Sequence, residues 1–177
     1  IRSRCHVLAL SPLPLALVQQ ALQERGIAPE RAARLARATR GRIAEALRMA
    51  NDDAALTRRE KQVAEVIAAL SEPLAALGFA RRLAEQYRRG RRAVVEDTLR
   101  LAVELWRDAL WLAADLNAPI VYEEARAALQ ELARREGLSG TARGLRATLQ
   151  ALADLEVNVQ ARLALDVAAM TWAEGSS

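Results

Sequence analysis

The chain has 177 residues, of which 52% are hydrophobic, 27% are charged and only 3% are aromatic. This balance argues against a disordered chain, and the length suffices for one medium domain or two small ones with an aliphatic core. The 26 Lys and Arg residues exceed the 22 Asp and Glu residues by only four, which is too small an excess to indicate nucleic-acid binding by itself. One cysteine excludes an internal disulfide, and with a single histidine it cannot supply the roughly four ligands of a structural zinc site.

The N-terminal part of the chain predicts one strand and three short helices. The strand-like run covers residues 6–10 and follows Ser3-Arg4-Cys5. Helices are predicted over residues 14–25, from Pro29 to near Gly41, and over residues 43–50, with glycine or polar residues at their ends. These three helices form a small unit at residues 11–52, and the strand lies outside it.

Five longer helices are predicted after residue 53, at about 57–72, 74–87, 93–116, 122–135 and 140–174. Thr57 and Glu60 fit the capping-box pattern at the start of the first of them. The helix at 93–116 carries one apolar stripe: Val95, Leu99, Ala102, Trp106, Ala109, Ala113 and Leu116. The last helix would be a rod of about 50 Å if unbroken. Its apolar side comprises Leu145, Leu149, Leu152, Leu155, Val159, Leu163, Val167 and Met170.

The pattern therefore predicts an all-α protein with a three-helix bundle at 11–52 and a five-helix bundle at 53–177. No apolar run approaches the roughly 18 to 20 residues of a membrane span, so we expect a cytoplasmic protein. The two long helices near 93–116 and 141–174 carry more apolar surface than one bundle needs, so part of it should face partner subunits. Trp111 lies off the buried stripe, and either a neighbouring subunit or ordinary packing would account for it.

Catalytic motifs are scarce in this sequence. It contains no phosphate-binding glycine loop, no HExxH and no GxSxG, and adjacent Cys5 and His6 would point to opposite faces of a strand. The most basic stretch, "RRLAEQYRRGRR", holds six arginines: Arg81, Arg82, Arg88, Arg89, Arg91 and Arg92. We interpret it as a solvated helix end, with a phosphate-contacting patch assisted by Tyr87 as the alternative.

Three stretches resemble the subunits of the bacterial DNA polymerase III clamp loader. Ser3-Arg4-Cys5, the strand and "LSPLP" resemble the end of their AAA+ ATPase module, where a Ser-Arg-Cys triplet carries an arginine finger. The stretch "GIAPERAARLARATRGRIAEALRMA" resembles their three-helix lid, and "LADLEVNVQARLALDVAAM" resembles the last helix of their oligomerisation domain, the collar. The resemblance implies that residues 1–10 are a remnant of the ATPase domain, 11–52 the lid and 53–177 the collar.

The resemblance also implies a role in replication. Members that hydrolyse ATP carry a sensor arginine three residues after the lid glycine, but Ala44 stands at this distance from Gly41, with Arg40 or Arg42 as possible substitutes. This departure favours the delta-prime subunit, which offers its finger to a neighbour, over the hydrolysing gamma/tau subunit. Arg4 is then the finger, with Arg2 as a second choice; no cofactor would bind this chain. Whether the chain belongs to an enzyme depends on the whole complex.

The partners implied are the motor and delta subunits, and through them the sliding clamp and primed DNA. Two alternatives come from other classes of protein. One is a helical nucleic-acid-binding module that uses residues 81–92, and the other is a helical scaffolding domain with no link to replication.

Overall fold

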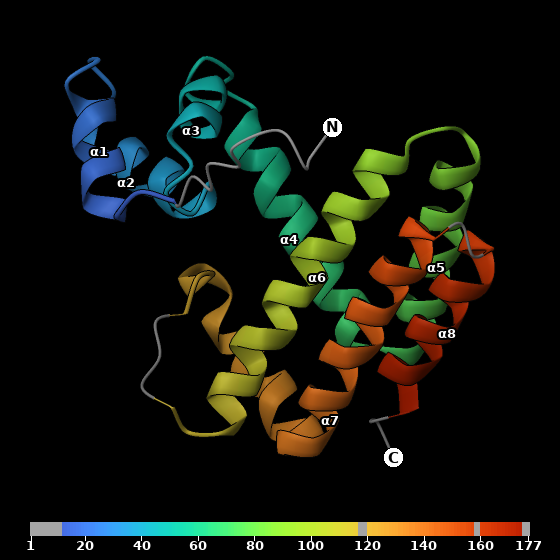
Figure 1. Cartoon of the computed structure of the whole chain (residues 1–177). Coiled ribbons are helices and arrows are strands. Elements are labelled where there is room, and N and C mark those ends of the chain that lie inside the picture. Colours follow the sequence, from blue (N-terminus) through green and yellow to red (C-terminus); the bar gives the residue numbers. More distant parts are fainter. Residues whose placement is uncertain (1–11, 117–119, 158–159, 175–177) are drawn as a thin grey trace, which may run out of the picture. The chain divides into compact units, whose positions relative to one another are not determined.

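The computed structural model describes residues 12–116, 120–157 and 160–174, and all regular structure in these ranges is helical (Figure 1). The predicted all-α class is confirmed. The expected strand at 6–10 and the Ser3-Arg4-Cys5 triplet lie outside the described residues. The chain forms two compact units, Ile1–Arg59 and Glu60–Ser177.

The described part of the first unit, residues 12–59, contains α1 (Leu15–Gln23), α2 (Pro29–Ala38), α3 (Ile43–Ala50) and the start of the next helix. Gly26 follows α1 with a φ of 82°, in the left-handed region that glycine adopts without steric cost. Small aliphatic side chains from all three helices form the core, which comprises Val18, Leu22, Ala32, Leu35, Ala36, Ala46 and, from the next helix, Leu56.

A glycine is required at residue 41, which follows α2, for two reasons. Its φ is 77°, and the preceding Arg40 is also left-handed at 52°. The N–H group of Leu13 donates to the Gly41 carbonyl oxygen at 2.9 Å, which brings the chain before α1 against this turn. A Cβ atom at Gly41 would overlap the Leu13 carbonyl oxygen, so a larger residue would displace this segment.

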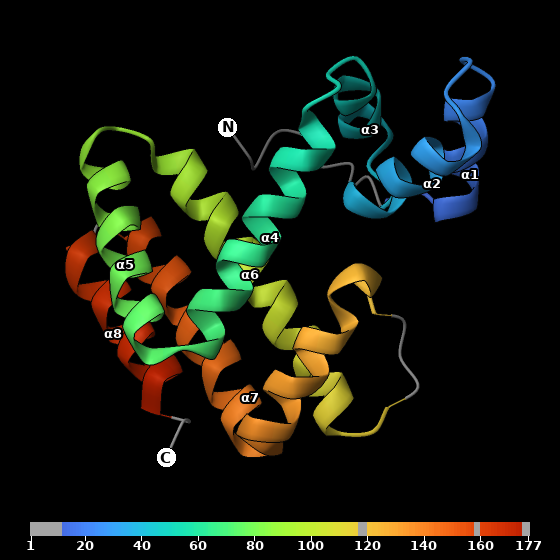
Figure 2. The same ribbon diagram turned by 180° about the vertical axis from the view of Figure 1, so that it is seen from behind.

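The second unit is built from five α-helices and a short 3-10 turn (Figure 2). Helix α4 begins in the first unit and continues into the second. Helix α6 packs against α7, and α8 packs against both α5 and α7. The elements are α4 (Ala55–Ser71), α5 (Pro73–Arg88), α6 (Arg92–Ala113), η2 (Glu123–Ala125), α7 (Arg126–Glu156) and α8 (Ala161–Glu174).

The predicted stripe of α6 is confirmed along most of its length. Five of its members are buried, whereas Ala113 is half-buried at the helix end and Leu116 lies exposed beyond it. The buried members are Val95, Leu99, Ala102, Trp106 and Ala109. Leu101 and Leu105 are also fully buried, because α6 is covered on more than one side.

The predicted cap at Thr57 is wrong. Helix α4 begins at Ala55, and the Asp52 carboxylate accepts the backbone N–H of Ala54 at 3.0 Å. Aspartate is as good an N-terminal hydrogen-bond acceptor as threonine, and Asp52 lies at the end of the preceding turn. The earlier start leaves Thr57 exposed inside the first turns of α4.

The predicted rod at 140–174 is also wrong, because the chain divides into α7 and α8 and turns back on itself. The indole N–H of Trp172 donates to the Thr148 hydroxyl oxygen at 3.0 Å. In an unbroken helix these residues would be about 36 Å apart. The reversal of the chain buries Leu165 and Trp172 of α8. This burial contributes hydrophobic stabilisation that an unbroken, unpacked helix would lack.

Gly137 ends the first segment of α7, as the sequence predicted. Its φ of 61° and ψ of −171° are not helical, so α7 is kinked there. Just before the kink, Arg135 donates to the carbonyl oxygens of Ser71 and, at 3.1 Å, Leu70. The guanidinium therefore satisfies two terminal carbonyl groups of α4 and joins helices that are distant in the sequence.

Replacing Gly144 with alanine should destabilise the second unit. A Cβ atom there would lie 2.5 Å from Cε2 of Trp106, so α6 and α7 would have to separate. We expect a net loss of about 1–2 kcal/mol in the free energy of unfolding, after the helix propensity gained by alanine. This loss can be measured by urea unfolding with tryptophan fluorescence as the probe, because all three tryptophans lie in the second unit.

Gly78→Ala is the matched control. Gly78 is also helical, and a Cβ atom there would only meet the flexible Arg82 side chain at 3.6 Å. This variant should be neutral or more stable by up to about 1 kcal/mol. Equal losses in the two variants would contradict the close contact between Trp106 and Gly144.

Candidate functional site

The residues that carry the resemblance to the ATPase module fall partly outside the described ranges. Arg4 and Arg2 lie there, so their predicted role as a finger stays a prediction. Ala44 is exposed on α3. Arg42 precedes this helix, and its Nη1 atom lies 3.8 Å from an oxygen of Glu45.

The described residues contain no group of three or more His, Cys, Asp or Glu side chains that could hold a metal ion. None of the helices in these ranges is long and apolar enough to cross a membrane.

Carboxylates pair with four of the six arginines in the stretch at 81–92. Four of its members form ion pairs: Arg82 with Glu65 at 2.8 Å, Arg88 and Arg89 with Glu85 at 2.8 Å, and Arg92 with Glu96 at 2.6 Å. Arg92 also donates to the carbonyl oxygen of Leu155 at 2.8 Å and lies 6.0 Å from the ring of Tyr87. The arrangement supports the solvated helix end over a phosphate-contacting patch.

Two buried carboxylates of α6 hold the segment that follows the helix. Asp108 is fully buried and accepts from Arg107 at 2.7 Å and from the backbone N–H of Val121 at 2.9 Å. The Tyr122 hydroxyl donates to Glu104 at 2.9 Å. These carboxylates have structural partners, and two of the partners, Val121 and Tyr122, could not be predicted from local spacing because they follow the end of α6.

Trp111 packs within this same region. Its side chain is half-buried, and the guanidinium of Arg107 lies 4.7 Å from its ring centroid. Such a stacked guanidinium covers one face of the indole. This contact lies within α6 itself, and both ordinary packing and a neighbouring subunit stay predictions for Trp111.

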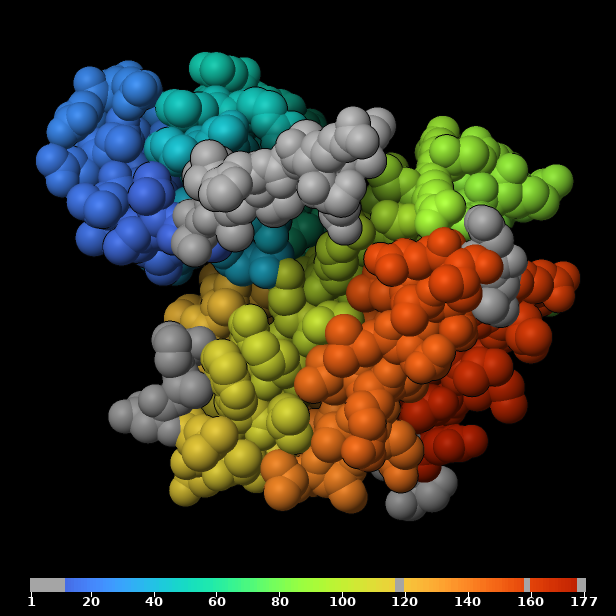
Figure 3. Space-filling view, viewed as in Figure 1, coloured from blue at the N-terminus to red at the C-terminus, as the bar shows by residue number. Residues whose placement is uncertain are grey.

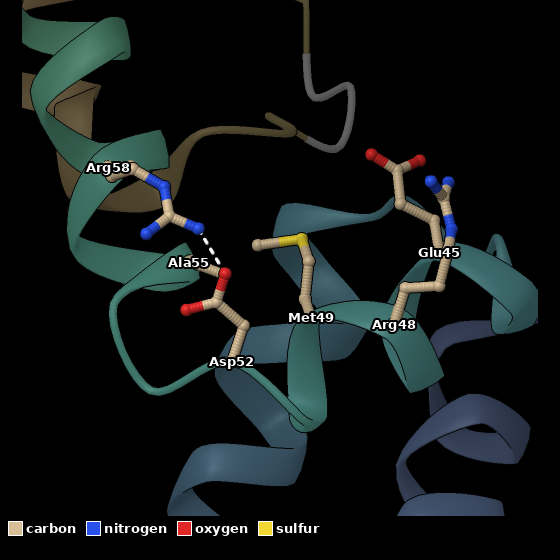
Figure 4. Close-up of a pocket in the computed structure, with 6 residues that line it drawn as sticks. All are labelled: Glu45, Arg48, Met49, Asp52, Ala55 and Arg58. Atoms are coloured by element: carbon tan, nitrogen blue, oxygen red, sulfur yellow. Dashed lines mark hydrogen bonds and ion pairs between the residues drawn. The ribbon is translucent and has the colours of Figure 1, made fainter.

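A small pocket opens on the first unit between α3 and the start of α4 (Figure 4). Its volume is about 200 Å³. Met49 stands between two pairs of charged side chains, with Asp52 and Arg58 on one side and Glu45 and Arg48 on the other. Ala55 completes the lining.

The charged side chains that line this pocket differ in their hydrogen-bond and ion-pair partners. Arg58 donates to Asp52, and this hydrogen bond lowers the pKa of the Asp52 carboxyl below its usual range. Glu45 has Arg42 as its ion-pair partner. Among the described residues no hydrogen bond or ion pair involves the Arg48 guanidinium, which is exposed at the rim.

The outer face of α8 is apolar, and its side chains belong to the apolar side predicted for the last helix. Leu163, Val167 and Met170 recur at steps of four and three residues and are 54–55% exposed. The opposite face of the helix is buried and comprises Ala164, Leu165, Ala168, Ala169 and Trp172. The predicted single stripe therefore divides: Leu155 on α7 is buried, whereas Leu163, Val167 and Met170 on α8 are exposed. Figure 3 shows α8 beside α7 in the second unit.

Comparisons of the chain with protein-family models, with curated proteins and with solved structures give no match. The structure itself defines an all-helical protein of two units, with an apolar helix face on one and a charged pocket on the other.

Removing the arginine partners of Glu85 should raise its pKa. Arg88 and then Arg89 hold the pKa of this carboxyl below its usual range by hydrogen bonding to it. We expect the pKa to rise toward the ordinary value for glutamate in an Arg88→Ala, Arg89→Ala variant, as measured by NMR titration of the side-chain carboxyl carbon. Any stability from this pair is present above the unfolded-state pKa and is lost as pH falls through the lower folded value.

Arg91→Ala serves as the control for this titration. Arg91 is an exposed arginine of the same stretch and is not a partner of Glu85. Its removal should leave the Glu85 titration unchanged. An unchanged titration in the double variant would show that the ion pairs do not persist in solution.

Proposed function

We propose that this chain is the lid and collar part of a clamp-loader subunit of the delta-prime type, which acts in DNA replication in the cytoplasm. The sequence resemblance over the lid and the last helix supports this proposal, as does the presence of a small three-helix unit before a larger helical unit. The apolar outer face of α8 is the observation that carries it, because a collar must offer surface to neighbouring subunits.

Helix α8 fits the role of an assembly contact because three apolar side chains lie exposed opposite its buried face, next to the Arg162–Asp166 ion pair. An apolar surface with a polar border is typical of protein–protein contacts. Leu163, Val167 and Met170 each keep about half of the side chain exposed. Burying the rest would contribute on the order of 1 kcal/mol per residue.

In the proposed complex the chain does not hydrolyse ATP but assists a neighbour that does. Phosphoryl transfer builds negative charge on the γ-phosphate oxygens, and Arg4 would neutralise it in trans. Arginine suits this task because its planar guanidinium remains charged and can contact two oxygens. Ala44 has no group that could contact phosphate, which supports the delta-prime over the gamma/tau assignment.

Val167→Glu should prevent assembly without unfolding the chain. A carboxylate in the centre of the outer face would have to lose water in the complex, which is costly without a partner. The full-length subunit that contains this chain would be co-expressed with the motor and delta subunits. We expect the complex to be lost in affinity purification and size-exclusion chromatography, while circular dichroism of the variant stays helical.

Val94→Glu is the matched control. Val94 is a valine of similar exposure on α6, and a carboxylate in the first turn of a helix is compatible with its dipole. The Val94→Glu variant should assemble with the motor and delta subunits as the parent protein does. Normal assembly of the Val167→Glu variant would overturn the proposed contact.

Arg4→Ala should reduce clamp-stimulated ATP hydrolysis by the assembled loader while leaving its subunit composition intact. Fingers of this kind contribute about 10³ to 10⁵ in rate in the systems where they have been measured. Arg2→Ala should have a smaller effect, because Arg2 lies outside the Ser-Arg-Cys triplet. Unchanged ATPase activity in the Arg4→Ala complex would refute the finger.

A further inference from the structure

We propose that the pocket of the first unit, lined by Glu45, Arg48, Met49, Asp52, Ala55 and Arg58, binds an acidic peptide segment of a partner protein. A carboxylate of the peptide binds Arg48, and a neighbouring apolar side chain enters the pocket against Met49. This interaction is separate from the contact of α8 and does not depend on the proposed replication role.

The charged side chains of the pocket favour an anionic group of the ligand at Arg48. Asp52 is satisfied by Arg58 and by the backbone N–H of Ala54, and Glu45 is paired with Arg42. Among the described residues, Arg48 is the arginine of the pocket without a hydrogen-bond or ion-pair partner. Its guanidinium offers the planar pair of donors that a carboxylate accepts in a bidentate manner.

The wider charge distribution would draw an acidic segment to this unit. Residues 12–59 contain nine arginines and no lysine against five carboxylates, an excess of four positive charges. Residues 60–174 contain fifteen basic and seventeen acidic residues, an excess of two negative charges. The modest net charge of the whole chain therefore conceals a basic first unit, and a field of this sign favours encounter with anionic partners.

The middle of the pocket suits an apolar side chain. Met49 is half-buried, and the flexible thioether can adapt to side chains of different shape. Methionine and arginine are both enriched in protein–protein interfaces. A volume of about 200 Å³ admits a side chain but not a folded element.

The same pocket is less suited to nucleic acid. Phosphates follow one another closely along a strand and are neutralised by several cations together. Here Glu45 and Asp52 remain beside the two arginines, so a second phosphate would approach a carboxylate. A peptide needs only one carboxylate at Arg48, and its apolar neighbour avoids this repulsion.

Fluorescence anisotropy of the full chain with a short labelled peptide of alternating leucine and aspartate tests the proposal at about 0.15 M salt. Arg48→Glu should weaken binding by about tenfold or more, the change that a lost interaction of about 1.4 kcal/mol produces. Arg48→Lys should bind with intermediate affinity, because lysine keeps the charge but lacks the planar fork.

Arg25→Glu is the control with the same change of net charge. Arg25 is exposed after α1, does not line the pocket and donates to the carbonyl oxygen of Ala21. Its effect should stay below about threefold, because salt screens charges beyond roughly 8 Å. Circular dichroism of each variant shows whether the helices persist.

Three results would overturn the proposal. The first is an absence of peptide binding by the parent chain, and the second is equal weakening by Arg25→Glu and Arg48→Glu. The third concerns the ligand: an alternating peptide of leucine and asparagine that binds equally well, or a single-stranded oligonucleotide that displaces the acidic peptide at lower concentration.

Discussion

The close contact between Trp106 of α6 and Gly144 of α7 is the constraint on which the second unit depends. The indole lies where any side chain at residue 144 would be. The same glycine carbonyl accepts the Thr148 hydroxyl at 2.8 Å, and Thr148 in turn accepts the indole N–H of Trp172 on α8. One glycine thus places α7 against α6, and one threonine places α8 against α7.

This arrangement decides which apolar side chains remain exposed. Because α8 turns back along α7, Leu165 and Trp172 enter the core, and Leu163 and Val167 face outward. Exposed apolar faces of this kind are typical of surfaces at which proteins associate. The functional proposal follows from this distribution, and the clamp-loader resemblance suggests which partners are involved.

The two units differ in their charge, which the net charge of +4 for the whole chain does not reveal. In the second unit Glu65, Glu85 and Glu96 form ion pairs with four of the six arginines at 81–92. In the first unit the exposed Arg48 guanidinium lies at the rim of the pocket. The pairs at three or four residues along one helix could be predicted from spacing, whereas the contact of Arg82 with Glu65 required the packing of two helices.

The helical class, the three short helices and most of the buried stripe of α6 could be predicted from the sequence, because periodicity and capping are local properties. The end of α7, the reversal of α8 and the exposed side of α8 depend on contacts between helices, so they could not be predicted in this way. A continuous apolar pattern is equally compatible with one rod or two packed helices. The choice depends on burial of residues such as Trp172 against Thr148 and Phe79, which are distant in the chain.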